Sequence, residues 1–302
     1  MGPIFIGISG WRYVPWRGVF YPPDLTQANE LHFASRALPS IELNGSFYSL
    51  QRPESYAEWH DETPAGFRFS VKGNRFLTHV LRLRDIDAPL ANVLASGGFN
   101  LRDKLGPFLW QFPPNFKFDP ERMDHFLSLL PHDTEQALEL ARRHEARMDG
   151  RTALAIDKRR PMRHAVEIRH ESFVDPAFIA MLRKYKVALV VADTAGKWPY
   201  CEDVTADFMY LRLHGDKELY ASGYTDEALD RWAERIRAWA SGGQPADAHL
   251  VSEKAPPKRA KREVYCYFDN DIKVRAPFDA RRLIARLGLD PEGKLTPLGG
   301  DS

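Results

Sequence analysis

Eight short runs rich in β-branched and aromatic residues recur along this chain of 302 residues. They are IFIGIS (4–9), SIELN (40–44), FRFSVK (67–72), PFLWQF (107–112), HAVEIR (164–169), VALVVAD (187–193), FMYLRLH (208–214) and EVYCYFD (263–269). Runs of this length and composition predict β-strands. The stretches between them are far longer than a hairpin turn of about two to five residues, so neighbouring strands should run parallel.

The clearest helical pattern between these runs is DEALDRWAERIRAWA, residues 226–240. Its apolar residues Leu229, Trp232, Ile236 and Trp239 fall on one face of a helix. Eight parallel strands joined by such crossovers close most economically into a barrel. A doubly wound open sheet would want a G-x-G-x-x-G turn after its first strand, and GISGWRY does not match. We therefore predict the α/β class, as a single (β/α)8 TIM barrel.

No linker divides the sequence, so one TIM-barrel domain is expected over residues 1–290, with a flexible tail at 291–302. A long charged stretch around 131–163 reads as an insertion into the barrel plan. The segment KAPPKRAKR (254–262) holds five cations. Because it precedes the eighth strand, we interpret it as a solvated loop at the amino-terminal end of the barrel, away from any chemistry.

Composition narrows the functional classes. The formal net charge is +1, which gives no overall field for a nucleic acid or a membrane surface. No stretch approaches the roughly 20 apolar residues of a membrane span, and MGPIFIGISG does not resemble a signal peptide. Cys201 and Cys266, the two cysteines, cannot form a disulfide framework or a thiolate zinc site. We predict a cytoplasmic protein without a membrane partner.

Polar residues stand at the predicted carboxyl ends of nearly all the strands, where TIM barrels place their active sites. These residues are Glu42, Asn44, Lys72, Gln111, Glu167, Arg169, Asp193, Arg212, His214, Asp269 and Asn270. Alternation along a strand lets Glu42 and Asn44 point into the barrel mouth together, as it does Arg212 and His214. A single pair of opposite charges at the strand ends could simply be an ion pair that closes the barrel. Charged residues on most strands, all at the same end, are better explained by a ligand site.

The expected catalytic residues are Glu42, Glu167, Asp193 and His214. Glu167, beside Arg169, would stay ionised, and Glu42 would be the proton donor. The same four residues resemble the oxygen-rich ligand set of a divalent metal, but three neighbouring cations disfavour one. We therefore predict no cofactor and no metal ligand, with a divalent metal as a weaker alternative. Lys72, Arg169 and Arg212 could instead clamp an anion.

The loop after the first strand is unusually aromatic: GWRYVPWRGVFYPPD, residues 10–24. We expect Trp11, Tyr13 and Trp16 to form one wall of the site, where rings stack on a sugar or a base, and Phe20 and Tyr21 to pack inward. The predicted substrate-binding residues are Trp11, Tyr13, Trp16, Asn44, Tyr48, Lys72, Gln111, Arg169, Arg212 and Asn270.

Eight segments together carry a resemblance to a known family. They are GISGWRYVPWRGVFYP (7–22), IELNGSFY (41–48), TPAGFRFSVK (63–72) with TH (78–79), LGPFLWQFPP (105–114), AVEIRH (165–170), VADTAG (191–196), YLRLHG (210–215) and YFDND (267–271). In this order they resemble the YecE-like family, domain of unknown function 72, over about residues 4 to 286. The resemblance implies a TIM barrel and a shared pocket at the strand ends. It implies no activity, because none is established for the family.

Three functions remain open. The first is an enzyme that acts on a small, polar, anionic ligand such as a sugar phosphate or a nucleotide-like compound, by carboxylate acid–base chemistry. Hydrolase, lyase and isomerase classes all fit it. The second is a ligand-binding or sensor protein without catalysis. The third, which the neutral net charge disfavours, is a nucleic-acid-processing barrel of the endonuclease IV type. The sequence leaves the oligomeric state open.

Overall fold

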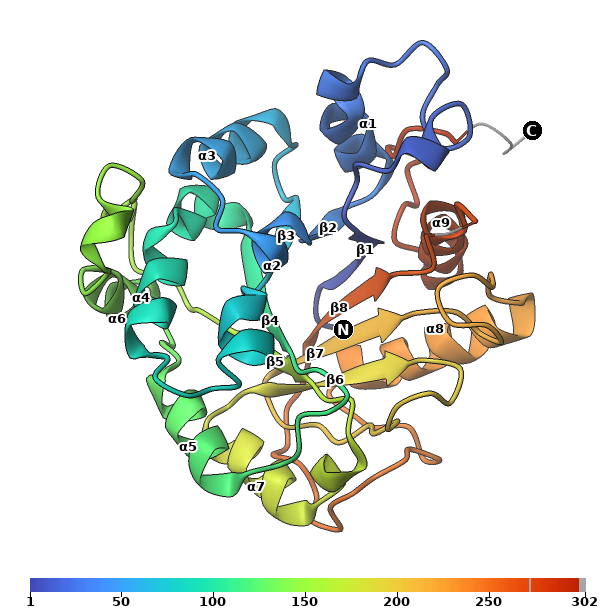
Figure 1. Ribbon diagram of the computed structural model, residues 1–302. Helices are drawn as coiled ribbons and strands as arrows, with labels where there is room; N and C mark the ends of the chain where they lie inside the picture. The colour runs from blue at the N-terminus through green and yellow to red at the C-terminus, as the bar shows by residue number, and fades with distance from the viewer. Residues whose placement is uncertain (272, 299–302) are drawn as a thin grey trace.

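A computed structural model describes residues 1–271 and 273–298 of the chain. Eight strands form one closed barrel, each strand parallel to the next and β8 parallel to β1 (Figure 1). They are β1 (Ile4–Ser9), β2 (Ser40–Leu43), β3 (Arg68–Lys72), β4 (Leu105–Gln111), β5 (His164–Glu167), β6 (Ala188–Asp193), β7 (Phe208–Leu213) and β8 (Glu263–Phe268). All eight predicted strands are present in the predicted order, which confirms the TIM barrel.

The helices surround the strands on the outside of the barrel (Figure 1). They are α1 (Glu30–Ala37), α2 (Gly45–Tyr48), α3 (Pro53–Glu62), α4 (Asp87–Ala95), α5 (Pro120–Leu129), α6 (Thr134–Ala141), α7 (Pro176–Lys184), α8 (Asp226–Ala240) and α9 (Ala276–Leu287). Short turns of helix are η1 (Val14–Trp16), η2 (Gln27–Asn29), η3 (Phe76–Val80), η4 (Gly98–Lys104), η5 (Ala146–Met148) and η6 (Glu171–Phe173). Residues 194–207 connect β6 to β7 without a helix.

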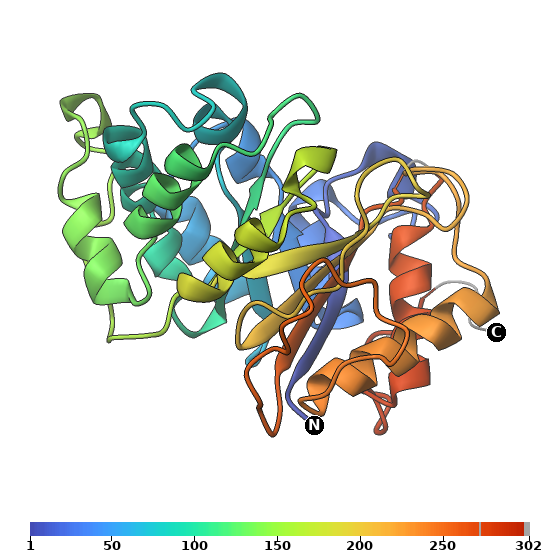
Figure 2. The ribbon, with the colours of Figure 1, turned by 90° about the horizontal axis from the view of Figure 1, so that it is seen from below.

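Helix α8 has the bounds that the sequence pattern predicted. Its first turn is closed by Thr225, whose side chain accepts a hydrogen bond from the Ala228 amide at 3.2 Å. The face with Leu229, Trp232 and Ile236 is buried. Figure 2 shows α8 and α9 lying side by side, and both helices contact β8. Apolar periodicity therefore determined both the helix and the side it turns to the barrel.

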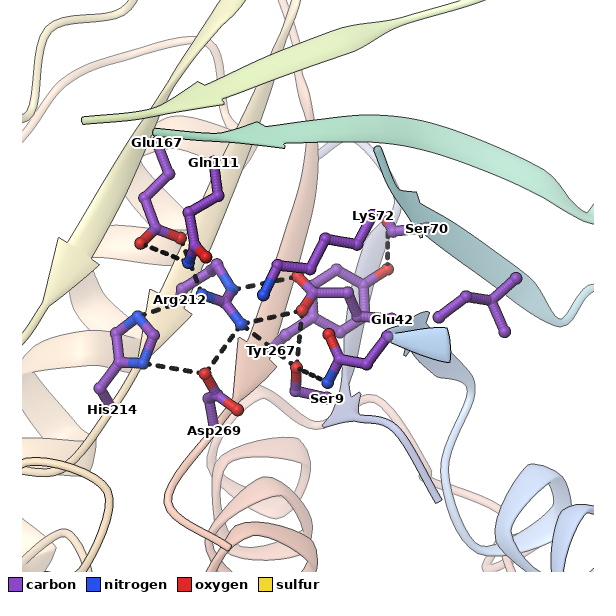
Figure 3. A network of polar contacts seen from close by, with 12 residues as sticks. Ser9, Glu42, Ser70, Lys72, Gln111, Glu167, Arg212, His214, Tyr267 and Asp269 are labelled. Atoms are coloured by element: carbon purple, nitrogen blue, oxygen red, sulfur yellow. Dashed lines mark hydrogen bonds and ion pairs between the residues drawn. The ribbon is translucent and has the colours of Figure 1, made fainter. Parts of the chain in front are cut away.

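The core has two parts. The larger part lies between strands and helices, whereas the barrel interior holds a smaller cluster that includes Leu109, Tyr210 and Tyr267. The Tyr267 hydroxyl lies 2.7 Å from Ser40 Oγ and 2.7 Å from Ser70 Oγ. The Tyr267 ring packs against that of Tyr210, whose hydroxyl donates to Glu42, so this polar contact adjoins the charged residues drawn in Figure 3.

Three segments that the sequence set apart from the strands and helices of the barrel can now be described. The predicted insertion at 131–163 contains α6 and η5, and an antiparallel bridge between Asp133 and Pro161 ties its two ends together. Residues 254–262 form a loop before β8. In the predicted tail 291–302, Leu298 is buried and the Thr296 amide donates to Arg36 O at 2.9 Å. Residues 299–302 lie outside the described part. None of the described helices is long and apolar enough to cross a membrane.

Candidate active site at the barrel mouth

Arg212, the fifth residue of β7, occupies the centre of the barrel mouth (Figure 3). Its side chain is 0% exposed. It donates from Nη2 to Glu42 Oε1 at 2.9 Å, from Nη1 to Glu167 Oε2 at 2.7 Å and from Nη2 to Asp269 Oδ2 at 2.8 Å. Burial opposes its charge, but the three carboxylates outweigh burial and hold the pKa of Arg212 well above its ordinary value. One guanidinium thus joins β2, β5 and the end of β8.

Glu42 accepts hydrogen bonds from every side. Ser9 Oγ donates to Oε1 at 2.6 Å, Tyr210 OH donates to Oε2 at 2.6 Å, and Arg212 donates to both oxygens. In each of these contacts Glu42 is the acceptor. The geometry does not support the prediction that Glu42 is the proton donor: both of its oxygens are taken up by these donors, and Glu42 positions Arg212.

Glu167 is also held as a carboxylate. Gln111 Nε2 donates to its Oε1 at 2.9 Å and Arg169 Nε donates to the same oxygen at 2.7 Å, while Arg212 occupies Oε2. Burial opposes ionisation, but Arg169 and Arg212 outweigh it and hold the pKa of Glu167 well below its usual range. Arg169 itself stacks on Trp198, with its guanidinium carbon 3.8 Å from the ring centre.

Lys72, the last residue of β3, differs from Arg212 in having no carboxylate partner. Its side chain extends toward Arg212 in Figure 3, and its Nζ lies 4.4 Å from the centre of the Phe47 ring. Within the described part of the chain, no hydrogen bond or ion pair holds this amine. Burial lowers the pKa of Lys72 to about 8, and the charge of Arg212 adds to the effect.

Two aspartates follow β8 and have opposite properties. Arg212 and His214 hold the pKa of Asp269 below its usual range although burial opposes this, and His214 Nδ1 lies 3.0 Å from Asp269 Oδ2. Asp271 lies beside the Tyr13 hydroxyl, and burial, with the negative charge of Asp269, raises its pKa to about 8. Asp269 is the ionised member of the pair and Asp271 the protonated one.

A cavity of about 380 Å³ adjoins this network on the side of β1 and β2. It is lined by Gly10, Trp11, Arg12, Tyr13, Leu43, Asn44, Gly45, Tyr48, Gln51 and Trp59. The rings of Trp11 and Trp59 meet edge to face, with centroids 5.4 Å apart. Asn44 Nδ2 donates to Ser9 Oγ at 2.8 Å, which connects the cavity to the Glu42 side of the network.

The aromatic loop divides differently from the prediction. Trp11, Tyr13 and Tyr48 line the cavity, and Phe20 and Tyr21 pack inward as expected. Trp16 does not line it: this ring is fully buried and packs against Tyr13, Phe20 and Tyr21. The proline-stiffened turn Val14–Trp16 directs Trp16 into the larger part of the core, so its assignment to the wall of the site is wrong.

Two further predicted residues lie apart from the Arg212 network. Asn270 is turned away from the mouth, because its Nδ2 donates to Ser222 O and to Asp279 Oδ2, both at 2.9 Å. Its assignment as a ligand-binding residue is corrected to a packing role beside α9. Asp193 accepts a hydrogen bond from Tyr224 OH at 3.0 Å, and burial raises its pKa. His214 remains in the network, 3.4 Å from Arg212 Nη1 through its Nε2.

Sequence reasoning placed Asp269 among the strand-end residues without a catalytic or binding role, and it did not single out Asp271 or Tyr210. A signal for the two aspartates was present in YFDND, because alternation puts the first and last residues of D-N-D on one side and the asparagine on the other. Tyr210 reads as an ordinary strand tyrosine, and only the closed barrel brings its hydroxyl to Glu42. Within the described residues, no group of three or more histidine, cysteine, aspartate or glutamate side chains is placed to hold a metal ion.

Removing the charge of Arg212 should lower the free energy of unfolding far more than removing the charge of Arg169. Arg212→Met leaves three buried carboxylates without their shared cation, so we expect a loss of about 3–5 kcal/mol in the free energy of unfolding. Arg169→Met leaves Glu167 with Arg212 and Gln111, and should cost less than half as much. Urea denaturation of both variants measures this. Equal losses would contradict the central role of Arg212.

Comparison with solved structures supports the fold. A DUF72 family protein from Thermotoga maritima MSB8, TM1631, matches with a TM-score of 0.68 at 23% identity, covering 94% of this chain and 99% of that one. A DUF72 family protein from Enterococcus faecalis V583, EF0366, matches with a TM-score of 0.66 at 17% identity, covering 99% and 100%. At these identities the likeness shows the barrel fold alone.

Curated relatives and the family model agree. The UPF0759 protein YunF of Bacillus subtilis (strain 168) is 30% identical over 40% of this chain and 43% of its own length. The UPF0759 protein YecE of Escherichia coli (strain K12) is 26% identical over 45% and 48%. The matched part thus spans just under half the length of these relatives. A family model described as "Protein of unknown function DUF72" matches residues 5–299. The chain therefore belongs to the DUF72 family.

Proposed function

We propose that the barrel mouth is the active site of an enzyme that acts on a small, polar, anionic ligand by acid–base chemistry. In this proposal the aromatic cavity holds the body of the ligand. Asp271 and Lys72 exchange protons with it, and Arg169 contacts its anionic group. Arg212, Glu42, Glu167 and Asp269 form the rigid support on which these groups stand.

The proposal rests on one observation: three buried polar atoms without a partner lie at one cavity. Trp11 Nε1, Asn44 Oδ1 and Asp271 Oδ1 are three of the ten buried side-chain atoms that have no hydrogen-bond partner among the described residues. Two of these residues line the cavity, and the third lies beside its Tyr13. Buried polar atoms are rarely left unpaired, because each one costs about 1–3 kcal/mol. A donor and two acceptors around aromatic rings suit a hydroxylated ligand, which both donates and accepts.

Asp271 and Lys72 suit proton transfer because the pKa of each side chain is shifted so that its uncharged form is favoured. The pKa of Asp271 rises and that of Lys72 falls, both mainly through burial, and both feel Arg212 and Asp269. General acids and bases work best when their pKa lies near the working pH. Glu42 and Glu167 are instead occupied by Arg212, so the carboxylate chemistry predicted for them passes to Asp271.

Arg169 supports the anionic part of the proposal. Its Nε is bound to Glu167, and its Nη2 lies 3.4 Å from the Tyr220 hydroxyl, so the guanidinium is fixed at the rim of the mouth. Its side chain is 12% exposed, whereas that of Arg212 is 0% exposed and fully occupied by carboxylates. An anion would therefore meet Arg169 rather than Arg212, which revises the clamp of three cations that the sequence suggested.

Ligand binding can be tested by thermal denaturation with sugar phosphates and nucleoside monophosphates, each paired with its unphosphorylated parent. We expect a phosphorylated compound at a hundredfold excess over its Kd to raise the Tm by about 5 °C, more than its parent does. Arg169→Met should remove this preference, and Tyr48→Ala should weaken binding of both, because Tyr48 is an exposed ring of the cavity wall.

Lys184→Met is the matched control, since Lys184 is an exposed cation on α7 paired with Asp124. It should leave the Tm shift unchanged. Equal stabilisation by phosphorylated and parent compounds would contradict the anionic ligand. A ligand that binds and stays chemically intact through long incubation would instead favour the sensor function, and binding of single-stranded nucleic acid that weakens steeply with salt would favour a nucleic-acid barrel.

The protonated state of Asp271 predicts a pH dependence of stability. Its pKa is raised from 3.8 to about 8 in the folded protein. Between these values the folded state keeps a proton that the unfolded state has lost, so this group makes the free energy of unfolding fall as pH rises, by at most about 1.4 kcal/mol per unit. The Asp271→Asn variant has no ionisable group at this position, so its stability lacks this contribution to the pH dependence. We expect its stability relative to wild type to increase from pH 4 to pH 8 and to level off above pH 8. Parallel urea-denaturation profiles over this range would show that Asp271 ionises normally.

A further inference from the structure

We propose that Lys72 is a nucleophile whose amine condenses with an aldehyde or ketone group of the ligand to form a Schiff base. This inference rests on the proposed function and deepens it, because it names a carbonyl compound as the substrate class. It starts from the position of the amine: at the carboxyl end of β3, inside the barrel mouth, with a side chain that is 8% exposed.

The structure offers an internal comparison in Lys104, a second buried lysine. Lys104 Nζ donates to Thr63 O at 2.6 Å, to Thr63 Oγ1 at 3.2 Å and to His60 O. All three donor positions of its ammonium form have acceptors, although burial lowers the pKa of Lys104 as well. Lys72 Nζ faces the Phe47 ring and the Arg212 guanidinium instead. A ring face attracts an ammonium ion but does not fix it as three hydrogen-bond acceptors do, and it donates no hydrogen bond to the lone pair of the deprotonated amine.

Burial and the charge of Arg212 favour the neutral amine of Lys72, and burial has the larger effect. Glu42, Asp269 and Glu167 act in the opposite direction. All three carboxylates are ion-paired to Arg212, and Glu167 also to Arg169, so each of them already has a closer cationic partner than Lys72. A lysine with a pKa of about 8 holds at pH 7 roughly two- to three-hundredfold more neutral amine than a lysine with an ordinary pKa. Desolvated lysines of this kind are the ones that form Schiff bases.

The step balances without an oxidant or a reductant. The Nζ lone pair bonds to the carbonyl carbon, the C=O electron pair moves to oxygen, and that oxygen takes up a proton. The nitrogen then gives up one proton to form the neutral carbinolamine. The hydroxyl group of the carbinolamine gains a proton and leaves as water while the nitrogen lone pair forms the C=N bond, and the nitrogen keeps its one remaining hydrogen and a positive charge. Asp271 lies at the same barrel mouth and burial keeps it protonated, so it is the acid that can donate these protons to the oxygen. The iminium ion then replaces the ammonium ion beside the carboxylates.

Pyridoxal 5′-phosphate, an anionic aromatic aldehyde, is a suitable probe. The whole protein is incubated with it at pH 7, the imine is reduced with borohydride, and peptide mass spectrometry measures the labelling rate of each lysine. We expect Lys72 to react at least about tenfold faster than Lys104 or any exposed lysine. Lys72→Arg keeps the positive charge and should lose this fast labelling, with its Tm measured to confirm folding.

Pyridoxal without the phosphate separates the two proposals. Fast labelling of Lys72 by both aldehydes at equal rates would support the Schiff base and contradict the preference for an anion. Faster labelling by the phosphorylated aldehyde supports both. If Lys72 reacts no faster than the exposed lysines with either probe, the nucleophile is excluded, whereas the thermal-shift result for phosphorylated ligands would still decide the proposed function.

Discussion

The arrangement of this barrel mouth depends on one buried guanidinium that three carboxylates share. Taking Arg212, Glu42, Glu167 and Asp269 out of water is expensive, and the cost is offset only because their hydrogen bonds are short and nearly complete. Each carboxylate comes from a different strand or strand end, so the contact also fixes how β2, β5, β7 and β8 meet. Ser9, Tyr210 and Gln111 complete the remaining acceptor positions.

Because nearly all hydrogen-bonding positions of Arg212 and its carboxylates are filled, only other groups at the barrel mouth can take part in chemistry. A residue that already satisfies all its partners cannot change its protonation or bind a ligand without breaking the network. Lys72 and Asp271 lie at the edge of the same network and are not enclosed by it. At both residues burial outweighs the neighbouring groups that favour the charged form, so the pKa of Lys72 falls and that of Asp271 rises. The unpaired atoms of Trp11 and Asn44 extend this incomplete region into the aromatic cavity.

The fold was predictable because its signals are local. Eight apolar runs and the period of residues 226–240 require no knowledge of distant contacts, and strand alternation correctly directed Glu42, Glu167 and Arg212 to one network. The division of roles within that network was not predictable. Glu42 becomes an acceptor through Ser9 and Tyr210, which reach it only after the barrel closes. Trp16 and Asn270 were misassigned because loop geometry, not sequence spacing, decides which way their side chains point.

The Arg212 network leaves Lys72 as a buried amine without a carboxylate partner. An NMR titration of Lys72 in ¹⁵N,¹³C-labelled protein tests it directly, with the signal assigned by comparison with Lys72→Arg. We predict a midpoint near pH 8. A midpoint near the ordinary lysine value of about 10.5 would show that a partner holds the ammonium ion, and would contradict the claim.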